Sequence, residues 1–147
     1  MLIELNTFEA LNLLTANSIG RIGCYEKDHV YIVPINYRLT HNYITCYSLE
    51  GKKIEMMRRQ PHVCFEVDEI IDSNNWCSVI VNGVFEEILE EQDLSELRPF
   101  FTEHWFRNKE ELTHDKKWES GRPSFYANQI FFKILIKQIS GRRQQGL

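Results

Sequence analysis

The chain has 147 residues, enough for one domain that buries a core without disulfides or metals. Its formal net charge of -4 argues against binding to nucleic acid or an anionic membrane, because both need a basic surface. No apolar run approaches the roughly 18 residues of a membrane span, and no signal-peptide pattern opens the sequence. We therefore expect a single cytoplasmic domain over residues 1–147, with a polar tail from about residue 143.

The four cysteines are far apart and contain no C-x-x-C pair: Cys24, Cys46, Cys64 and Cys77. Each falls inside an apparent strand. This spacing indicates neither a zinc site nor a redox pair. We expect no metal, and we expect the thiols to be buried as small hydrophobic side chains.

A capping box opens the first expected helix. Asn6 is followed three residues later by Glu9, and hydrophobic residues then recur at helical spacing until about Asn17. The strand that follows contains Gly20 and Gly23. Glycines so placed in a strand predict a bend or a close approach of another group to the backbone.

Two strands and a helix are expected next, at residues 29–39, 43–47 and 52–59. Pro34 interrupts the first of these strands. Because proline cannot donate a backbone hydrogen bond, position 34 is expected at an edge, a bend or a bulge.

The helix expected at residues 52–59 begins with Lys52 and Lys53, directly after Gly51. Two positive charges at a helix start oppose the macrodipole, whose positive end lies there. A bound phosphate would explain them, because free N–H groups, the Ser48 hydroxyl and the ammonium groups together form a phosphate-sized site. The alternative is that both lysines are solvated at a surface turn, and this segment alone does not decide between the two.

The remaining elements are read from hydrophobic periodicity and turn residues. We expect a strand at 63–68, a long strand at 76–88 with a bulge or hairpin turn at 82–83, one helix or two divided at Pro99, a loop with some helix at 108–121, and a closing strand from 130 that ends at 141–143. These add up to six or seven strands joined by short connections. The order lacks regular strand–helix alternation and any G-x-G-x-x-G, so a mainly β fold is expected, an antiparallel barrel with peripheral helices.

Five segments in succession resemble one known family. They are GRIG at 20–23, VPINY at 33–37, SLEGKKI at 48–54, RQPHVCFEVD at 59–68, and WCSV at 76–79 with a glycine at 83. The succession resembles the pyridoxamine 5'-phosphate oxidase-like FMN-binding split β-barrel proteins, and within them the nitroimidazole-resistance (nitroimidazole reductase-like) branch. The resemblance implies a six-stranded antiparallel Greek-key split β-barrel that forms a homodimer with FMN at the subunit interface.

The resemblance also implies a set of FMN contacts. Lys53 would bind the phosphate, with support from the helix start and the strand before it: Lys52, Gly51, Ser48, Cys46 and Tyr47. The isoalloxazine ring would border Val33, Pro34, Ile35 and Asn36, and the W-x-S-V residues Trp76, Ser78 and Val79 would lie near the flavin.

The sequence departs from the family pattern at two places. Many relatives have histidine followed by serine or glycine where this chain has Cys46-Tyr47, and often arginine where it has Cys77. The substrate-binding arginine and histidine of the oxidase itself are not recognisable near the C-terminus, so oxidation of vitamin B6 is not expected.

The expected function is an FMN-dependent oxidoreductase that passes electrons from a reduced nicotinamide or another donor to a small acceptor such as a nitro-aromatic compound. Because the flavin carries the chemistry, no catalytic side chain is assigned. A flavin-binding module without turnover is the first alternative. A haem-binding split barrel is less favoured, because the histidines at 29, 41 and 62 lie at expected turns or strand starts.

Overall fold

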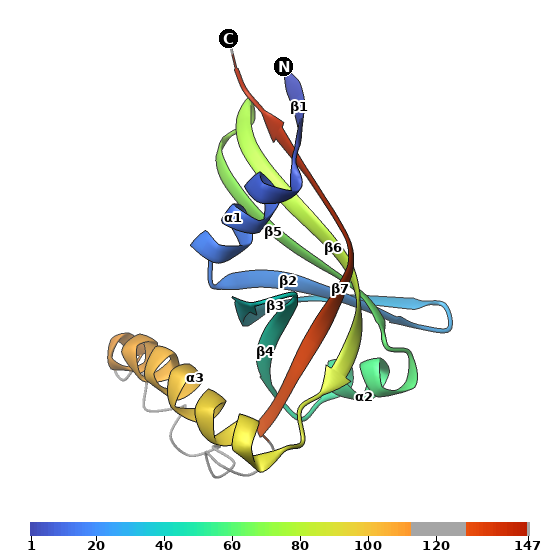
Figure 1. Cartoon of the computed structure of the whole chain (residues 1–147), viewed down its shortest axis with the longest axis vertical. Helices are drawn as coiled ribbons and strands as arrows, with labels where there is room; N and C mark the ends of the chain where they lie inside the picture. The colour runs from blue at the N-terminus through green and yellow to red at the C-terminus, as the bar shows by residue number, and fades with distance from the viewer. Residues whose placement is uncertain (113–128, 147) are drawn as a thin grey trace.

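A computed structural model of the chain describes residues 1–112 and 129–146, with side chains described for 1–101 and 129–146 (Figure 1). Its elements follow in the order β1 (Leu2–Leu5), α1 (Thr7–Ala16), β2 (Ile19–Glu26), β3 (His29–Thr40), β4 (Tyr43–Leu49), α2 (Lys52–Arg59), β5 (His62–Asp72), β6 (Asn75–Glu87), α3 (Glu91–Leu112) and β7 (Gln129–Gln144).

The strands form one antiparallel sheet in the order β1-β7-β4-β3-β2-β5-β6, and a further pairing of β7 with β6 closes six of them into a ring. The expected mainly β fold, a six-stranded antiparallel barrel with peripheral helices, is therefore confirmed. β1 was not expected. Its four residues pair with residues 141–144 of β7 as an added strand, too short for alternation to reveal in the sequence.

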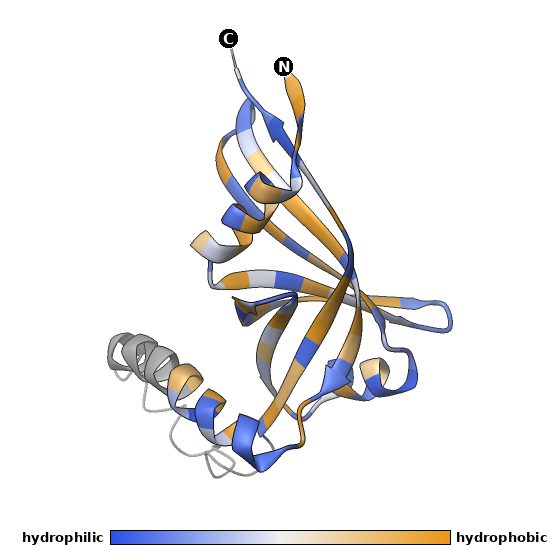
Figure 2. Ribbon diagram, viewed as in Figure 1, coloured by the Kyte–Doolittle hydropathy of each residue, from blue (hydrophilic) through white to orange (hydrophobic). Residues whose placement is uncertain are grey.

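The core consists of the inward-facing side chains of the barrel strands together with one face of α2. Phe65, Phe132 and Ile22 are fully buried, and Ile54 and Met57 of α2 join the same cluster. The helix therefore packs into the barrel core. Figure 2 shows hydrophobic residues along the strands and hydrophilic ones at the tip of the β2–β3 hairpin.

Two glycines are required by close packing inside the sheet. A Cβ at Gly20 would lie 2.3 Å from Cζ of Phe65, so the close approach predicted for this strand is confirmed. At Gly83 a Cβ would lie 2.5 Å from Cγ2 of Ile134. The register with β7 shifts between Asn82 and Gly83 while β6 continues, so the interruption is a bulge and not a hairpin turn.

One of the two hydrogen bonds of the predicted capping box is present, since the Glu9 amide donates to Oδ1 of Asn6 at 2.8 Å. α1 is anchored to the barrel by Tyr37, whose hydroxyl donates to the Leu14 carbonyl at 2.6 Å. The N-terminal helix is thus fixed against the sheet by both capping and a buried tertiary hydrogen bond.

The C-terminal strand differs from the prediction. β7 continues through Gly141 to Gln144, and its residues Arg142 and Arg143 pair with both β1 and β6. Glycine is needed at position 141, because a Cβ there would lie 2.9 Å from Cδ1 of Leu5. β7 therefore ends at Gln144, one residue beyond the end expected at 141–143. α3 is one helix that continues through Pro99, and part of the loop expected at 108–121 lies outside the described residues.

The cysteine prediction is correct for two residues only. Cys24 and Cys46 are buried, Cys77 is partly buried and Cys64 is exposed because it lies on the outward face of β5. In the described part of the chain, no helix is both long and apolar enough to span a membrane.

Candidate functional site

Strands β3 and β4 separate halfway along β3. Their pairing runs from Asn36 opposite Tyr47 to Thr40 opposite Tyr43, whereas residues 29–35 of β3 pair with β2 alone. β4 pairs with β7 along its whole length, and its last two residues, Ser48 and Leu49, pair with β7 alone. Pro34 lies in the half with one neighbour, so its missing N–H breaks no ladder on that side, and the predicted edge position is confirmed. We call this separation the split.

α2 begins directly after β4 at the split, and its first turn has no side-chain cap. Gly51 is the N-cap residue, and a Cβ there would meet nothing nearer than the Leu49 carbonyl at 4.0 Å. The space beside the Gly51 Cα is therefore open, at a helix start whose first-turn N–H groups ordinarily need a partner. Ser48 is buried beside it, and its hydroxyl donates to the Leu49 carbonyl at 2.9 Å.

Two lysines project from this first turn. Nζ of Lys52 lies 5.3 Å from the centroid of the Tyr31 ring on β3. Lys53 is half-buried, and burial lowers the pKa of its ammonium group although Cys24 and Cys46 nearby act in the opposite direction. Among the side chains that the structure describes, neither lysine forms an ion pair. The helix start is therefore a cationic site whose lysines have no ion-pair partner in the described part of the chain.

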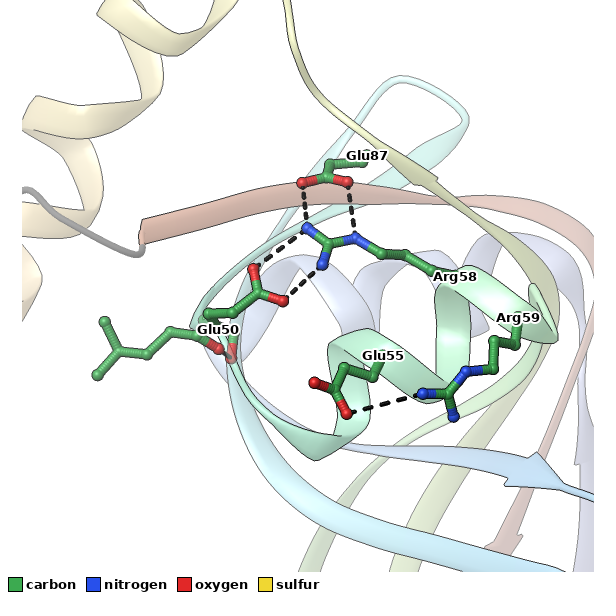
Figure 3. Close-up of polar contacts among 7 residues, drawn as sticks. Glu50, Glu55, Arg58, Arg59 and Glu87 are labelled. Carbon is green, nitrogen blue, oxygen red and sulfur yellow. Dashed lines mark hydrogen bonds and ion pairs between the residues drawn. The ribbon is translucent and has the colours of Figure 1, made fainter.

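The opposite end of α2 is fully compensated (Figure 3). Arg58 bonds Glu50 and Glu87, with Nη2 2.8 Å from Oε1 of Glu87. Arg59 contacts Glu26 at 2.8 Å and Glu55 at 3.8 Å. Glu50 and Glu55, each two positions from one of the lysines, are thus engaged by Arg58 and Arg59, and neither forms an ion pair with a lysine.

The residues predicted to border the ring lie along the single-sided half of β3 and at its end. Ile35 is in the core and Val33 packs partly against it, whereas Pro34 is exposed and Asn36 half-buried on the outward face. A planar ligand at this edge could therefore contact the backbone, Pro34 and Asn36, but not the Ile35 side chain.

The strand before the helix start contributes little side-chain surface. Cys46 is completely buried, and burial raises the pKa of its thiol well above the ordinary value, which makes it unreactive. Tyr47 packs under α3, with its ring 5.9 Å from that of Phe101 and 5.2 Å from that of Phe131. Both residues support the split structurally.

The W-x-S-V residues lie elsewhere in the chain. Trp76 is near the start of β6 beside Gln144, whereas the other end of β6 reaches α2 through Glu87 and Arg58. Eleven residues separate Trp76 from Glu87, a path of about 35 Å along a strand. One chain therefore does not bring Trp76 or Ser78 to Lys53, and Val79 is buried in the core. Figure 1 shows the first half of β6 away from α2.

An apolar groove of about 890 Å³ crosses the outward face of the barrel. Its hydrophobic lining includes Tyr25, Val30 and Ile32 of the β2–β3 hairpin, which are exposed by 42%, 74% and 65%. Large exposed hydrophobic side chains that gather on one face mark an interaction surface.

A charged cluster at the groove was missed by the sequence analysis. Nη1 of Arg21 lies 2.8 Å from Oδ2 of Asp68 and 3.8 Å from Oε2 of Glu66. Oε1 of Glu66 is buried without a hydrogen-bond partner, and burial together with Asp68 raises the pKa of Glu66 to about 7. Its signal in the sequence was two acids at alternate positions of a strand, hence on one face.

No group of three or more histidine, cysteine or acidic side chains gathers as a metal site in the part of the chain that the structure describes. His29, His41 and His62 are exposed, at strand starts or a turn, where they offer no buried axial ligand. These three histidines therefore provide no axial ligand from the interior of the chain.

Comparison with known proteins gives matches over nearly the whole chain. The sequence profile of the family described as pyridoxamine 5'-phosphate oxidase matches residues 7–143. The structure of a FAD-binding protein from Mesorhizobium loti is 34% identical, covers 99% of each chain and has a TM-score of 0.77. A FAD-binding protein from Mycobacterium smegmatis is 25% identical over 97% of this chain and 98% of its own, with a TM-score of 0.66.

Two further matches are more limited. An uncharacterised protein from Rhizobium meliloti is 35% identical over 80 residues, which is 54% of this chain and about half, 53%, of that relative. A candidate 5-nitroimidazole antibiotic resistance protein from Bacteroides thetaiotaomicron shares the fold at 16% identity, with a TM-score of 0.68 over 97% of this chain and 89% of its own. From the profile match and the full-length relative, the chain belongs to the pyridoxamine 5'-phosphate oxidase-like split-barrel family.

Proposed function

We propose that this chain is a flavin-dependent oxidoreductase that binds FMN at the split, with the phosphate at the start of α2. The observation that carries the proposal is the uncapped first turn, where the half-buried Lys53 and the neighbouring Lys52 have no counter-charge among the described side chains. A phosphate would supply that charge and accept hydrogen bonds from the first-turn N–H groups. Two relatives described as FAD-binding support a flavin as the ligand.

The phosphate site fits FMN, and it fits FAD equally well, because FAD contains FMN as one of its two halves. In both flavins one phosphate follows the ribityl chain of the isoalloxazine, so Lys53 would have the same role. FMN is our expectation because the contacts proposed here, from Ser48 to Lys53 and along β3, serve only that common part. Acid release of the flavin followed by chromatography against both standards decides between them.

We propose further that the site is completed in a homodimer. The apolar groove, with Val30 and Ile32 exposed by 74% and 65%, provides the face for a second copy. Trp76 and Ser78 lie far from Lys53 within one chain, so a second copy is the source from which they would reach the flavin. The face and the divided site thus support the same assembly.

The bound flavin would supply the redox chemistry, while this chain binds and orients it. The overall reaction proposed is NAD(P)H + H⁺ + R–NO₂ → NAD(P)⁺ + R–NO + H₂O. The nicotinamide loses a hydride, and the nitro group takes up two electrons and two protons and loses one oxygen as water. The nitro-aromatic acceptor follows from the resemblance to the nitroimidazole-resistance branch.

The function is tested with purified protein. A flavin absorption spectrum is expected, bleached by NADH or NADPH without oxygen and restored by a nitro-aromatic compound. A bound flavin that NADH and NADPH do not reduce, and that a nitro-aromatic compound does not reoxidise after reduction by dithionite, would indicate a binding module without turnover. Colourless protein that fails to bind added FMN or FAD would overturn the flavin assignment, and a Soret band would indicate haem.

The assembly is tested by sedimentation of Ile32→Glu beside the unmodified chain. Because the Ile32 side chain is 65% exposed, the substitution should leave the monomer folded while placing a charge in the groove. We expect the variant to be monomeric and to bind flavin more weakly. An unmodified chain that holds flavin as a monomer, or a variant that remains a tight dimer, would contradict the interface.

A further inference from the structure

The paired half of β3 carries another cation without an ion pair among the described side chains. Arg38 lies on the outward face opposite Thr45 of β4, and Cζ of its guanidinium is 4.3 Å from the centroid of the Phe100 ring in α3. Its Nε is buried without a hydrogen-bond partner. Among the side chains that the structure describes, no carboxylate forms an ion pair with Arg38.

Thr40 adds an unpaired hydroxyl to the same face. Its Oγ1 is also buried without a hydrogen-bond partner, and residues two apart on a strand point to the same side. Leaving a guanidinium N–H and a hydroxyl unpaired in a buried position is unfavourable. A ligand that accepts from both would remove that cost, and a carboxylate is the group that matches the planar guanidinium.

The position of Arg38 relates this face to the split. Asn36, the last of the residues proposed to border the flavin ring, is two residues before Arg38 on the same face, a distance of about 7 Å along a strand. Phe100 provides aromatic surface beside the two, whereas the ring of Tyr47, directly opposite Asn36, is packed against Phe101 and Phe131. An aromatic ring whose carboxylate lies at Arg38 would therefore extend toward the proposed flavin.

We propose that Arg38 and Thr40 bind the carboxylate of an aromatic acid, which is the electron acceptor of the proposed oxidoreductase. The assignment rests on the proposed flavin function and specifies its substrate class. Arg38 is then a specificity-determining residue that distinguishes acidic from neutral acceptors. It adds a contact outside the residues that would hold the flavin itself.

The test compares 4-nitrobenzoate with 4-nitrobenzamide, which differ in charge and little in size, as acceptors for the flavin-loaded protein. We expect kcat/KM of the unmodified chain to favour 4-nitrobenzoate by tenfold or more. Arg38→Gln should reduce this preference by about 10- to 100-fold, the effect of losing a charge-assisted hydrogen bond. Thr40→Val, which removes only the hydroxyl, should cause a smaller loss in the same direction.

Lys133→Gln is the matched control, because Lys133 lies on β7 on the same outward face, 5.2 Å from the Tyr43 ring, and already pairs with Glu86. It should change the preference less than threefold. A control effect as large as that of Arg38→Gln would show general attraction of anions and overturn the site.

A binding measurement without turnover separates this inference from the proposed function. Calorimetric titration with benzoate should give saturable binding to the unmodified chain as purified, and binding at least tenfold weaker to Arg38→Gln. Equal benzoate affinity in the two proteins, or none in the unmodified chain, overturns the carboxylate site even if both nitro compounds are reduced. Benzoate binding that requires Arg38 in a protein unable to reduce either acceptor would uphold the site and reject the redox function.

Discussion

The two ends of α2 each carry two cations, which are ion-paired at one end and not at the other. Arg58 and Arg59, at the end where the macrodipole favours positive charge, are paired with four carboxylates. Lys52 and Lys53, at the end where it opposes positive charge, have no ion pair among the described side chains. The arginines thus have partners within the described fold, whereas the lysines are where we propose that a phosphate supplies the opposite charge.

The largest effect should come from Lys53→Ala, which removes a cation from the end of α2 that we propose binds phosphate. Flavin affinity should fall by about 1.5–3 kcal/mol, since one charge-assisted hydrogen bond to phosphate is lost. The apoprotein should be as stable as before or slightly more stable, because a half-buried ammonium ion is removed. Fluorescence titration with FMN measures the first quantity and thermal unfolding of apoprotein the second.

If the flavin affinity of Lys53→Ala is unchanged, the flavin phosphate does not bind at the start of α2. A large loss of apoprotein stability would instead assign Lys53 to the fold, which would make the two ends of the helix alike. The two measurements therefore distinguish a ligand-binding lysine from a structural one.

Glu66 extends the comparison to a carboxylate that is incompletely paired. Its pKa is raised from 4.5 to about 7, because the folded protein favours the protonated carboxyl group. The contribution of this group to the unfolding free energy is therefore fully present below about pH 4.5 and is lost as the pH rises through about 7. Unfolding free energy should therefore fall over this range, by about 1–2 kcal/mol for this group after allowing for solvent screening of a side chain that is 30% exposed.

The measurement is denaturant unfolding at pH 5 and pH 8, at one protein concentration. Glu66→Gln should remove this part of the pH dependence and be more stable than the unmodified chain at pH 8. Parallel pH profiles for both proteins would show that Arg21 compensates Glu66 fully despite its closer contact with Asp68.

The barrel, the helix start and the edge position of Pro34 could be predicted because each has a local signal. Alternation identifies half-buried strands, a proline reports a missing donor, and Lys52-Lys53 after glycine contradict the dipole at one position. β1 and the end of β7 escaped prediction because Leu2–Leu5 is too short for a period and Gly141 resembles a strand terminator. In the fold, Gly141 is instead required by the contact with Leu5.

The site could be predicted only in part because its charge balance is tertiary. Glu50 is only two positions before Lys52 in sequence, yet it binds Arg58, more than one turn further along the helix. Arg38 and Glu66 carry no motif, and their lack of partners is visible only when neighbouring strands and α3 are placed around them. The position of Trp76, far from Lys53, likewise depends on the path of β6.

Arg58→Ala should produce the converse of the Lys53 result at the other end of α2. Loss of the contacts with Glu50 and Glu87 should lower the unfolding free energy by up to about 1 kcal/mol, because the pairs are partly exposed to solvent. The loss should shrink at high salt. Thermal unfolding at low and high ionic strength measures it, and flavin affinity altered more than stability would contradict the division of roles.

The smallest effect should come from Lys52→Ala, which tests the two lysines against each other. Adjacent helix residues point in different directions, and Lys52 is exposed with its ammonium group over Tyr31, whereas Lys53 is half-buried. Flavin affinity should therefore fall by no more than about 0.5 kcal/mol, mostly through long-range attraction that salt screens. FMN titrations of both variants at two salt concentrations provide the measurement. If Lys52→Ala instead weakens binding more than Lys53→Ala and the loss persists at high salt, the phosphate lies over the β3 side of the helix start, next to Tyr31, and the roles of the two lysines are exchanged.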